Sequence, residues 1–304
     1  MKVRLGDYIE EYSVRNKGNE NIPVYSVTNT QGFCQDYFGK EVASKDKTTY
    51  KIVPRGCFAF NPSRINVGSV DWQRNEERVI VSPLYNVFSV SEQLDQQYLY
   101  YYLKSDFALQ RIKAVATGSV RDNLKLAMLY EFPIDIPAKL VQKEIVEKLD
   151  RVKRLINLRE RELQSLDELV KARFVEMFAT EENRMPLSEL CLIITDGTHQ
   201  PPKFKSKGIP FIFVSNITED KVTYDAEKFI DQDTYDELIK RTPIEIGDVL
   251  LSTVGSYGHP AVVKSDKKFL FQRHIAYLKP KREIIDSDYL HGAILSPAAQ
   301  EQML

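Results

Sequence analysis

Cysteine and histidine are scarce in this chain, and the few present are scattered. Its 304 residues include three cysteines and four histidines, none at the short spacing that a zinc site or a redox pair of cysteines requires. An odd number of isolated cysteines gives no disulfide framework and is typical of a protein kept in a reducing compartment. We therefore expect neither a metal centre nor a disulfide-rich secreted fold.

Long apolar runs are also missing. The N-terminal residues Met1–Asp7 lack the apolar core of a signal peptide, and no run approaches the roughly 20 apolar residues that a membrane-spanning helix needs. Charge is balanced, with 42 Lys and Arg against 43 Asp and Glu, so no basic field extends over the whole protein. We expect a soluble cytoplasmic protein whose contacts with anions depend on local patches.

Catalytic signatures are a third absence. A nuclease or phosphoryl-transfer site needs clustered carboxylates for a divalent metal, and a methyltransferase needs a glycine-rich cofactor loop followed by an acidic residue. The segment Gly255-Ser256-Tyr257-Gly258 is rich in glycine, but it lacks the lysine of a P-loop. The sequence predicts a non-catalytic chain with no metal and no cofactor of its own.

What the chain does contain is an internal repeat of domain size. The segment Ile22–Asn29 is similar to Ile209–Asn216. Later matches share one offset of 191 residues, and they pair Gly56 with Gly247, Asp95 with Asp286, Tyr98-Leu99 with Tyr289-Leu290, and Ser105 with Ser296. A constant offset over so long a stretch indicates two copies of one domain rather than the short units of a solenoid.

Each copy has the pattern of a mixed α+β domain, with a β-rich sheet followed by helices. In the first copy, residues 1–138, runs of branched and aromatic residues predict strands at Val24–Val27, Cys57–Phe60, Arg78–Val81 and Asn86–Val90, and a helical period follows over Leu94–Lys113. In the second copy, residues 181–304, we expect strands at Phe211–Val214, Val249–Leu251 and Ile275–Leu278, and a helix at Asp288–Gln302.

A long charged helix separates the two copies, in residues 139–180. Apolar residues recur at spacings of three, four or seven from Lys139 to Phe178, and a helix of this length extends about 60 Å. Such a helix cannot bury its own apolar seam, so the pattern predicts a coiled-coil partner. The seam consists of Ile145, Leu149, Val152, Ile156, Leu163, Leu166, Val170 and Met177.

The second copy is shorter than the first by this count. With the same offset, the counterpart of Lys139 would fall near position 330, beyond Leu304. We therefore expect a second copy that is incomplete at its C-terminus, and a helix over 139–178 that pairs with another chain, in a homodimer or with a different partner.

Polar loops next to the predicted strands are the candidates for binding DNA. Arg can form paired hydrogen bonds with guanine and Asn with adenine, while hydroxyls and Lys contact phosphate. The alternative is that these residues form surface turns, because Asn, Asp, Ser and Gly favour turns for backbone reasons. The loop candidates in the first copy are Asn61, Ser63, Arg64, Ser119, Arg121 and Asn123; those in the second are Thr198, His199, Lys203, Lys205, Ser252, Ser256 and Tyr257. Two further candidates in the second copy, Gln272 and Arg273, are expected within a strand.

Several segments resemble one known family, the specificity (S) subunits of type I restriction-modification systems. The segment Asp196–His199 with the prolines after it is similar to the opening of many target-recognition domains in that family. Ile134–Pro137, followed by Gln142 and Ile145–Asp150, is similar to the entry into the family's central helix. Gly247–Leu250 and the region of Gln272 also fit, and the resemblance covers the whole chain.

The resemblance implies a division of labour among subunits. Each recognition domain would read one half of a split double-stranded DNA target, and the helix would set the spacing between the halves. Methyltransferase (M) subunits carrying S-adenosylmethionine would dock on the helix and methylate adenine. A restriction (R) subunit would supply ATP- and Mg-dependent translocation and cleavage. The alternative that the residues leave open is a non-catalytic protein-interaction scaffold built on a coiled coil, which the neutral net charge favours.

Overall fold

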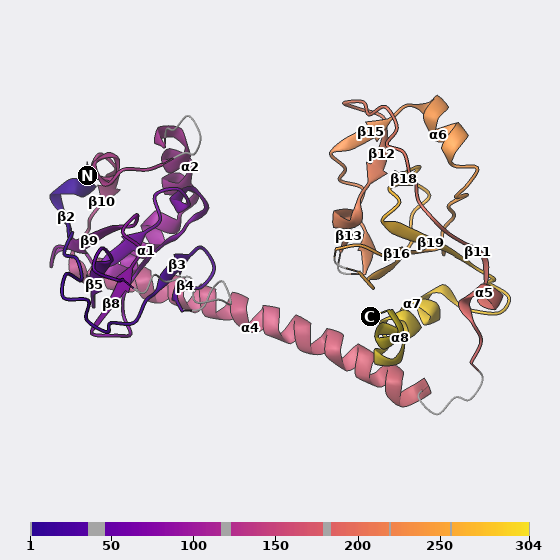
Figure 1. Cartoon of the computed structure of the whole chain (residues 1–304), viewed down its shortest axis with the longest axis horizontal. Helices are drawn as coiled ribbons and strands as arrows, with labels where there is room; N and C mark the ends of the chain where they lie inside the picture. The colour runs from indigo at the N-terminus through magenta and orange to yellow at the C-terminus, as the bar shows by residue number, and fades with distance from the viewer. Residues whose placement is uncertain are drawn as a thin grey trace. The chain divides into compact units, whose positions relative to one another are not determined.

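The structure is a computed structural model that describes residues 2–35, 46–116, 123–178, 184–218, 220–255 and 257–303. The chain divides into two compact units, Met1–Leu158 and Arg159–Leu304, called unit 1 and unit 2 below (Figure 1). Both units combine small sheets with helices, and one long helix runs from the first into the second. The predicted fold class, α+β domains joined by a long helix, is confirmed.

Unit 1 is built on a four-stranded antiparallel sheet with the order β2-β9-β6-β7. Its strands are β2 (Ile9–Glu11), β9 (Asn86–Val90), β6 (Phe58–Phe60) and β7 (Val70–Trp72). Phe58 stands opposite Phe88 in the register, and their rings stack with centroids 5.1 Å apart. Both side chains are fully buried, so this aromatic pair forms the centre of the larger core of unit 1.

Smaller pairs of strands surround that sheet. β1 (Lys2–Arg4) pairs with β10 (Pro133–Asp135), β3 (Ser26–Thr28) with β4 (Gly32–Cys34), and β5 (Lys51–Pro54) with β8 (Arg78–Val81), all antiparallel. The predicted strands Arg78–Val81 and Asn86–Val90 have the predicted bounds. The predicted strand Val24–Val27 begins later, at Ser26, because Val24 contributes only an isolated bridge to Ile80.

The predicted helix over Leu94–Lys113 is two helices, α1 (Gln96–Lys104) and α2 (Asp106–Val115). Ser105 lies between them in an extended conformation, and its hydroxyl accepts from the backbone N–H of Ala108 at 3.3 Å. It therefore ends one helix and caps the next. A short helix, α3 (Leu126–Tyr130), follows.

The long helix α4 spans Lys139–Phe178, the predicted bounds. Its first turns pack on unit 1, where Gln142 is fully buried. Farther along, the apolar stripe faces outward. Of the predicted seam, Ile145 is half-buried, whereas Leu149 is 38% exposed and Val170 69%. The helix thus presents an uncovered apolar face along most of its length.

Unit 2 repeats the architecture of unit 1. Its four-stranded antiparallel sheet has the order β11-β19-β16-β17, formed by β11 (Cys191–Asp196), β19 (Ile275–Pro280), β16 (Val249–Ser252) and β17 (Pro260–Val262). A three-stranded sheet contains β15 (Lys228–Ile230), β12 (Ile209–Ile212) and β18 (Leu270–Phe271), and a hairpin contains β13 (Ile217–Thr218) and β14 (Lys221–Val222). The helices are α5 (Leu187–Leu190), α6 (Gln232–Leu238), α7 (Ser287–Leu295) and α8 (Pro297–Met303).

Two predictions for unit 2 are wrong in their details. The strand expected at Phe211–Val214 is β12, which ends at Ile212, and a 3-10 helix takes up Val214–Asn216. The helix expected at Asp288–Gln302 is again two helices, broken at Ser296, which precedes Pro297. A residue before proline is disfavoured in the helical conformation, so the break has a local cause.

The residues of the repeat have equivalent structural roles. Gly56 and Gly247 each lie just before a central strand. Their φ angles are positive, 87° and 90°, a conformation that glycine adopts without steric strain. Asp95 caps α1 and Asp286 caps α7, each side chain accepting two backbone N–H groups of the first turn. The 191-residue offset therefore marks a shared backbone design.

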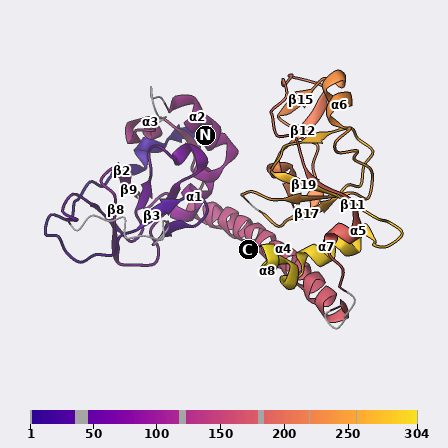
Figure 2. The ribbon, with the colours of Figure 1, turned by 45° about the vertical axis from the view of Figure 1, so that its right-hand side comes forward.

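An aromatic cluster joins α7 to the last turns of α4 within unit 2. The ring of Tyr289 lies 5.3 Å from that of Phe174 and 4.9 Å from that of Phe178, centroid to centroid, and Figures 1 and 2 both show α7 beside the end of α4. Gly292 allows this approach, since a Cβ there would come within 2.8 Å of the Phe174 ring.

Unit 2 also contains a buried carboxylate. Asp248 is fully buried and accepts from the hydroxyl of Tyr277 at 2.7 Å. Lys279 and Arg282 lie 3.4 and 3.5 Å from its two oxygens. Burial, and then the hydrogen bond to Asp248, raise the pKa of Tyr277, so this hydroxyl remains a donor.

No helix in the described parts of the chain is long and apolar enough to cross a membrane.

Candidate nucleic-acid interface

Three strand ends meet at one end of the four-stranded sheet of unit 2. The register pairs Asp196, the last residue of β11, with Ala276, and it pairs Ser252, the last residue of β16, with Ile275. β19 begins at Ile275 and runs antiparallel to both neighbours. The loops that follow β11 and β16 therefore meet the turn that precedes β19. We call this place the loop end of unit 2.

Backbone hydrogen bonds hold two of these segments together. Thr198 donates its N–H to the carbonyl of Phe271 at 2.9 Å, and Arg273 donates to the carbonyl of Thr198 at 3.1 Å. Gly197 makes this contact possible, because a Cβ there would lie 2.4 Å from the carbonyl oxygen of Gln272. The structure thus brings together Thr198, His199, Gln272 and Arg273, which are far apart in the sequence.

An acidic residue organises the charges at this loop end. Asp196 accepts from a ring nitrogen of His199 at 2.5 Å and from Arg241 at 2.5 Å. His199 and Arg241 are each 53% exposed, so Arg241 presents guanidinium donors and His199 its second ring nitrogen to solvent while the carboxylate fixes their positions. Arg241 was not among the sequence candidates, because it follows α6 in a turn and nothing local links it to Asp196.

The surroundings of Gln272 and Arg273 differ from the prediction. They were expected within a strand, but β18 ends at Phe271, and Arg273 and His274 form the turn before β19. Arg273 is exposed and Gln272 is half-buried. At this turn position the Nε of Arg273 donates to Nε2 of His274 at 3.4 Å, and its exposed guanidinium suits a reader of base edges better than a strand position does.

The loop between β16 and β17 contributes less than expected. Ser252 is 1% exposed, and its hydroxyl accepts from the backbone N–H of His259 at 3.0 Å, so this side chain closes the loop from inside. Tyr257 is 43% exposed and is the described candidate of this loop that reaches solvent. Ser256 lies outside the described residues.

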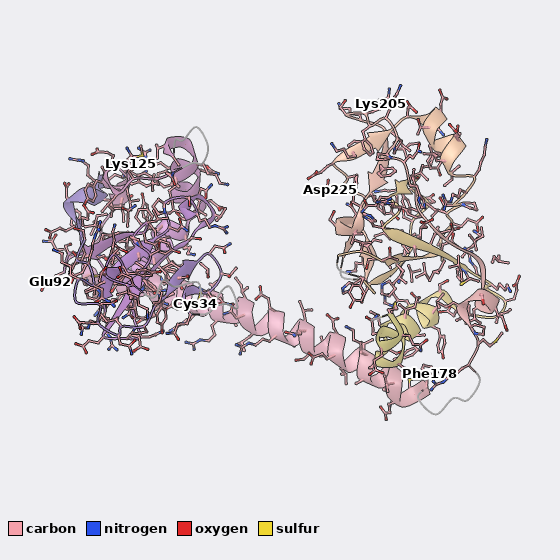
Figure 3. The ribbon with its side chains drawn as sticks, viewed as in Figure 1. Cys34, Glu92, Lys125, Phe178, Lys205 and Asp225 are labelled. Carbon is pink, nitrogen blue, oxygen red and sulfur yellow. The ribbon has the colours of Figure 1, made fainter. Side chains whose placement is uncertain are left out.

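Two predicted lysines lie elsewhere in unit 2. Lys203 is exposed in the segment after the loop end. The backbone of Lys205 forms an isolated β-bridge with Phe229 in β15, and its side-chain ammonium lies 3.5 Å from the Asp231 carboxylate. It belongs to the end of unit 2 that carries α6 (Figure 3). The structure therefore separates Lys205 from the Thr198 and Arg273 group.

In unit 1 the candidates gather on the connection between β6 and β7. The side-chain oxygen of Asn61 accepts from both the backbone N–H and the hydroxyl of Ser63, at 3.1 and 2.9 Å. Asn61 and Ser63 therefore form a turn, which was the alternative considered for them. Arg64 is exposed at the end of this turn, and Ile65 anchors it with a fully buried side chain.

Asn123 lies beside the same connection. The next residue, Leu124, is fully buried and donates its N–H to the carbonyl of Pro62 at 3.1 Å, while Asn123 itself is exposed. The structure thus brings Arg64 and Asn123 to neighbouring places. Ser119 and Arg121 lie outside the described residues.

Both arrangements suit recognition of a nucleic acid. Exposed Arg, Asn and His side chains provide hydrogen-bond donors and acceptors that match base edges and phosphates. No group of three His, Cys, Asp or Glu residues that could hold a metal occurs in the described ranges. What the two loop groups can do chemically is bind a polyanion and distinguish its bases.

Comparisons with known proteins agree with this class. The sequence matches the family described as type I restriction modification DNA specificity domain over residues 3–168. A solved structure described as the structural basis of complex assembly and conformational transition of the type I R-M system is similar, with a TM-score of 0.55 and 20% identity over 98% of this chain and 80% of that one. No curated protein matches the chain.

Two further solved structures are similar over nearly the whole chain. The HsdS subunit from Thermoanaerobacter tengcongensis matches with a TM-score of 0.41 and 19% identity, covering 97% of this chain and 78% of that one. The type I restriction-modification S subunit from M. genitalium matches with a TM-score of 0.44 and 15% identity, covering 100% and 79%.

Duplicated sheets with polar loop groups define a protein of the sequence-reading class. The family match extends over more than half of the chain, so the chain belongs to the type I restriction-modification DNA specificity family. Its function is DNA sequence recognition, as the sequence predicted.

Proposed function

We propose that this chain reads a split double-stranded DNA target, with each unit reading one half. The observation that carries the proposal is that the two units share one strand order, β2-β9-β6-β7 and β11-β19-β16-β17. Both also expose polar side chains at the same end of that sheet, where β6 and β16 end and β9 and β19 begin. The reading residues would be Arg64 and Asn123 in unit 1, and His199, Arg273 and Tyr257 in unit 2.

The helix α4 would connect the halves of the target. It is continuous from Lys139 to Phe178 and therefore belongs to both units. A rise of about 1.5 Å per residue makes it a rigid spacer. Its exposed stripe, including Leu163 at 63% and Val170 at 69%, supports pairing with a helix of a second copy or of a partner subunit, because isolated apolar stripes of this size are unfavourable in water.

The partners follow from the family and from the solved relative, which concerns complex assembly in a type I R-M system. Methyltransferase subunits would dock on α4 and carry S-adenosylmethionine, and a restriction subunit would bind ATP and Mg. This chain would contribute the DNA address and no bond-making step. With such a division the chain would act in the cytoplasm, where the DNA is.

The central test maps methylated adenines in cells that express the chain with its methyltransferase subunit. A split motif is expected, with two defined halves and a fixed gap. Arg64→Ala should relax or weaken one half, and Arg273→Ala the other, each by about tenfold in binding, since one paired contact to a base contributes about 1–3 kcal/mol. Arg184→Ala, at an exposed position before α5, is the matched control.

The outcomes separate the readings. If both variants weakened all duplexes equally, these arginines would contact phosphate and the assignment to bases would be wrong. If the wild-type chain bound no duplex and left no methylated motif, the scaffold alternative would replace DNA reading.

Helix pairing has its own test. Analytical ultracentrifugation of the full chain at micromolar concentration should show a dimer, and Leu163→Glu should shift it to monomer by placing a charge in the seam. Gln164→Glu, on an adjacent exposed position, should leave the dimer in place. A wild-type monomer with an intact helix would contradict homodimerisation.

A further inference from the structure

Three cations surround one tyrosine ring in unit 1. The Nζ atoms of Lys153 and Lys104 lie 5.4 and 5.6 Å from the centroid of the Tyr100 ring, and Cζ of Arg74 lies 5.7 Å from it. The cations come from three elements: Arg74 follows β7, Lys104 ends α1, and Lys153 belongs to α4. The guanidinium of Arg74 also stacks on Trp72, 4.6 Å from that centroid.

The carboxylates nearby do not balance this charge. Asp71 lies 2.5 Å from Arg74 and is nearly buried, so it compensates one cation. Asp150 accepts from the hydroxyl of Tyr101. Within the described residues, no carboxylate forms an ion pair with Lys104 or Lys153. Each ring contact of this kind contributes only about 0.5–1 kcal/mol, so the cluster retains an excess of positive charge that an anion would neutralise.

Lys104 ties the cluster to the connection that carries Arg64. Its ammonium donates to the carbonyl of Gly68, the residue that closes this connection, and to the carbonyl of Asn29 at 3.0 Å. Burial lowers the pKa of Lys104, Asp71 raises it, and Lys153 lowers it again. The two backbone carbonyls fix the position of Lys104, and Arg74 and Lys153 are the exposed cations of the group.

We propose that Arg74, Lys104 and Lys153 around Tyr100 form a phosphate-binding patch that holds the DNA backbone beside the base-reading connection of unit 1. The proposal rests on DNA recognition by this unit and adds residues that act independently of sequence. A duplex is favoured over an acidic protein because the patch continues, through Lys104 and Gly68, into the connection that presents Arg64. Regularly spaced phosphates suit cations that are held on three rigid elements.

The test measures binding of a mixed-sequence DNA duplex to the full chain by fluorescence anisotropy, between about 50 and 200 mM KCl. Lys153→Gln keeps most of the side-chain stem and removes the charge at an exposed helical position. Its affinity at about 100 mM salt should fall about threefold to tenfold, and the slope of log K against log[KCl] should decrease by about 0.9, the loss of one phosphate contact. Lys153→Arg should restore both.

Lys148→Gln is the matched control. Lys148 is an exposed lysine of α4, five residues earlier, and therefore about 140° around the helix from Lys153. It should bind the duplex as the wild type does. The loss in Lys153→Gln should also be the same on the methylation target and on an unrelated duplex, whereas Arg64→Ala should act on the target alone.

Each result decides the question. An unchanged slope and affinity in Lys153→Gln would overturn the patch while leaving base reading by Arg64 intact. Binding of polyglutamate, a model for an acidic protein, is measured in the same way. If Lys153→Gln lost binding to polyglutamate and kept its binding to the duplex, the proposal would also be overturned, and the patch would be assigned to an acidic protein. If Lys148→Gln lost as much as Lys153→Gln, the effect would be net charge rather than a site.

Discussion

The two units share a backbone design but fill equivalent positions with opposite chemistry. Asp248 follows Gly247 in unit 2, and the residue that follows Gly56 in unit 1 is Cys57. Asp248 is bonded to Tyr277 and lies near Lys279 and Arg282, whereas Cys57 is buried in an apolar cluster that includes Val87. In the strand register Val87 stands where Tyr277 does.

This difference shows what the fold requires. A buried ion-pair network and an apolar cluster of similar volume can occupy the same place with similar net stability, because Coulomb attraction and hydrogen bonds offset the cost of removing charge from water. The strand order tolerates the exchange. What it does not tolerate is half of the network, since a single buried charge without partners is costly.

The largest expected effect comes from breaking that network. Asp248→Ala should destabilise unit 2 by about 3 kcal/mol and leave unit 1 unchanged. Urea unfolding separates the units, because the chain has one tryptophan, Trp72 in β7, whose fluorescence reports unit 1, while circular dichroism reports both. Cys57→Ala, at the equivalent position, should cost only about 1 kcal/mol and shift only the Trp72 transition. Equal losses at both sites would contradict the comparison.

The next effect concerns how each unit holds α4. Unit 1 uses Gln142, which accepts from the N–H of Asp95 at 2.8 Å and donates to the carbonyls of Gln93 and Pro137 at 2.9 and 2.8 Å. Gln142→Ala leaves these buried groups unpaired and should cost about 2 kcal/mol, read from Trp72 fluorescence. Gln164→Ala, on an exposed part of α4, should cost nothing measurable. If Gln142→Ala left the unfolding transition of Trp72 fluorescence unchanged, water would be replacing the hydrogen bonds of the Gln142 amide.

Unit 2 holds the same helix through rings, and conservative variants at equivalent positions sharpen the contrast. Tyr98→Phe should cost about 1 kcal/mol, because the Tyr98 hydroxyl donates to the carbonyl of Asp135 at 2.8 Å. Tyr289→Phe should be neutral, since its contribution is the ring packed on Phe174 and Phe178. Tyr289→Ala should then cost at least about 1 kcal/mol, which is the contribution of the ring contacts beyond their buried area. The measurement is urea unfolding by circular dichroism, and a loss in Tyr289→Phe would show that the hydroxyl matters.

The smallest effect is one of pH. A hydrogen bond from Lys279, then its charge, lowers the pKa of the exposed Glu245 below the ordinary 4.5. Because the folded pKa is the lower one, this contribution is complete above about pH 4.5 and is lost as pH falls through the folded pKa. Unit 2 should therefore lose slightly more stability on acidification than the Glu245→Gln variant does. If the acid unfolding curves of the two proteins were parallel, the ion pair of Glu245 with Lys279 would make no measurable contribution to stability.

Local signals in the sequence were sufficient for the long helix α4. The bounds of α4 could be predicted because prolines and a heptad pattern act within a few residues of chain. The breaks at Ser105 and Ser296 were missed, although the signal was present: the same serine recurs at the 191-residue offset, and serine is a frequent N-cap. For the candidate site, the sequence proposed Arg64, Asn123, His199 and Arg273, which the structure exposes, but it could not show that Ser252 is buried.

By itself, then, the sequence determined two copies of one domain and a long helix between them, because periodicity, caps and repeats depend on neighbours along the chain. Only the tertiary structure decided which residues act together. The antiparallel register of β11, β16 and β19 brings His199 and Arg273 to one sheet end, with Arg241 bonded to Asp196 there, and the packing of α1 against α4 sets Lys104 and Lys153 around Tyr100. Such groupings depend on contacts between distant segments, which no local pattern encodes.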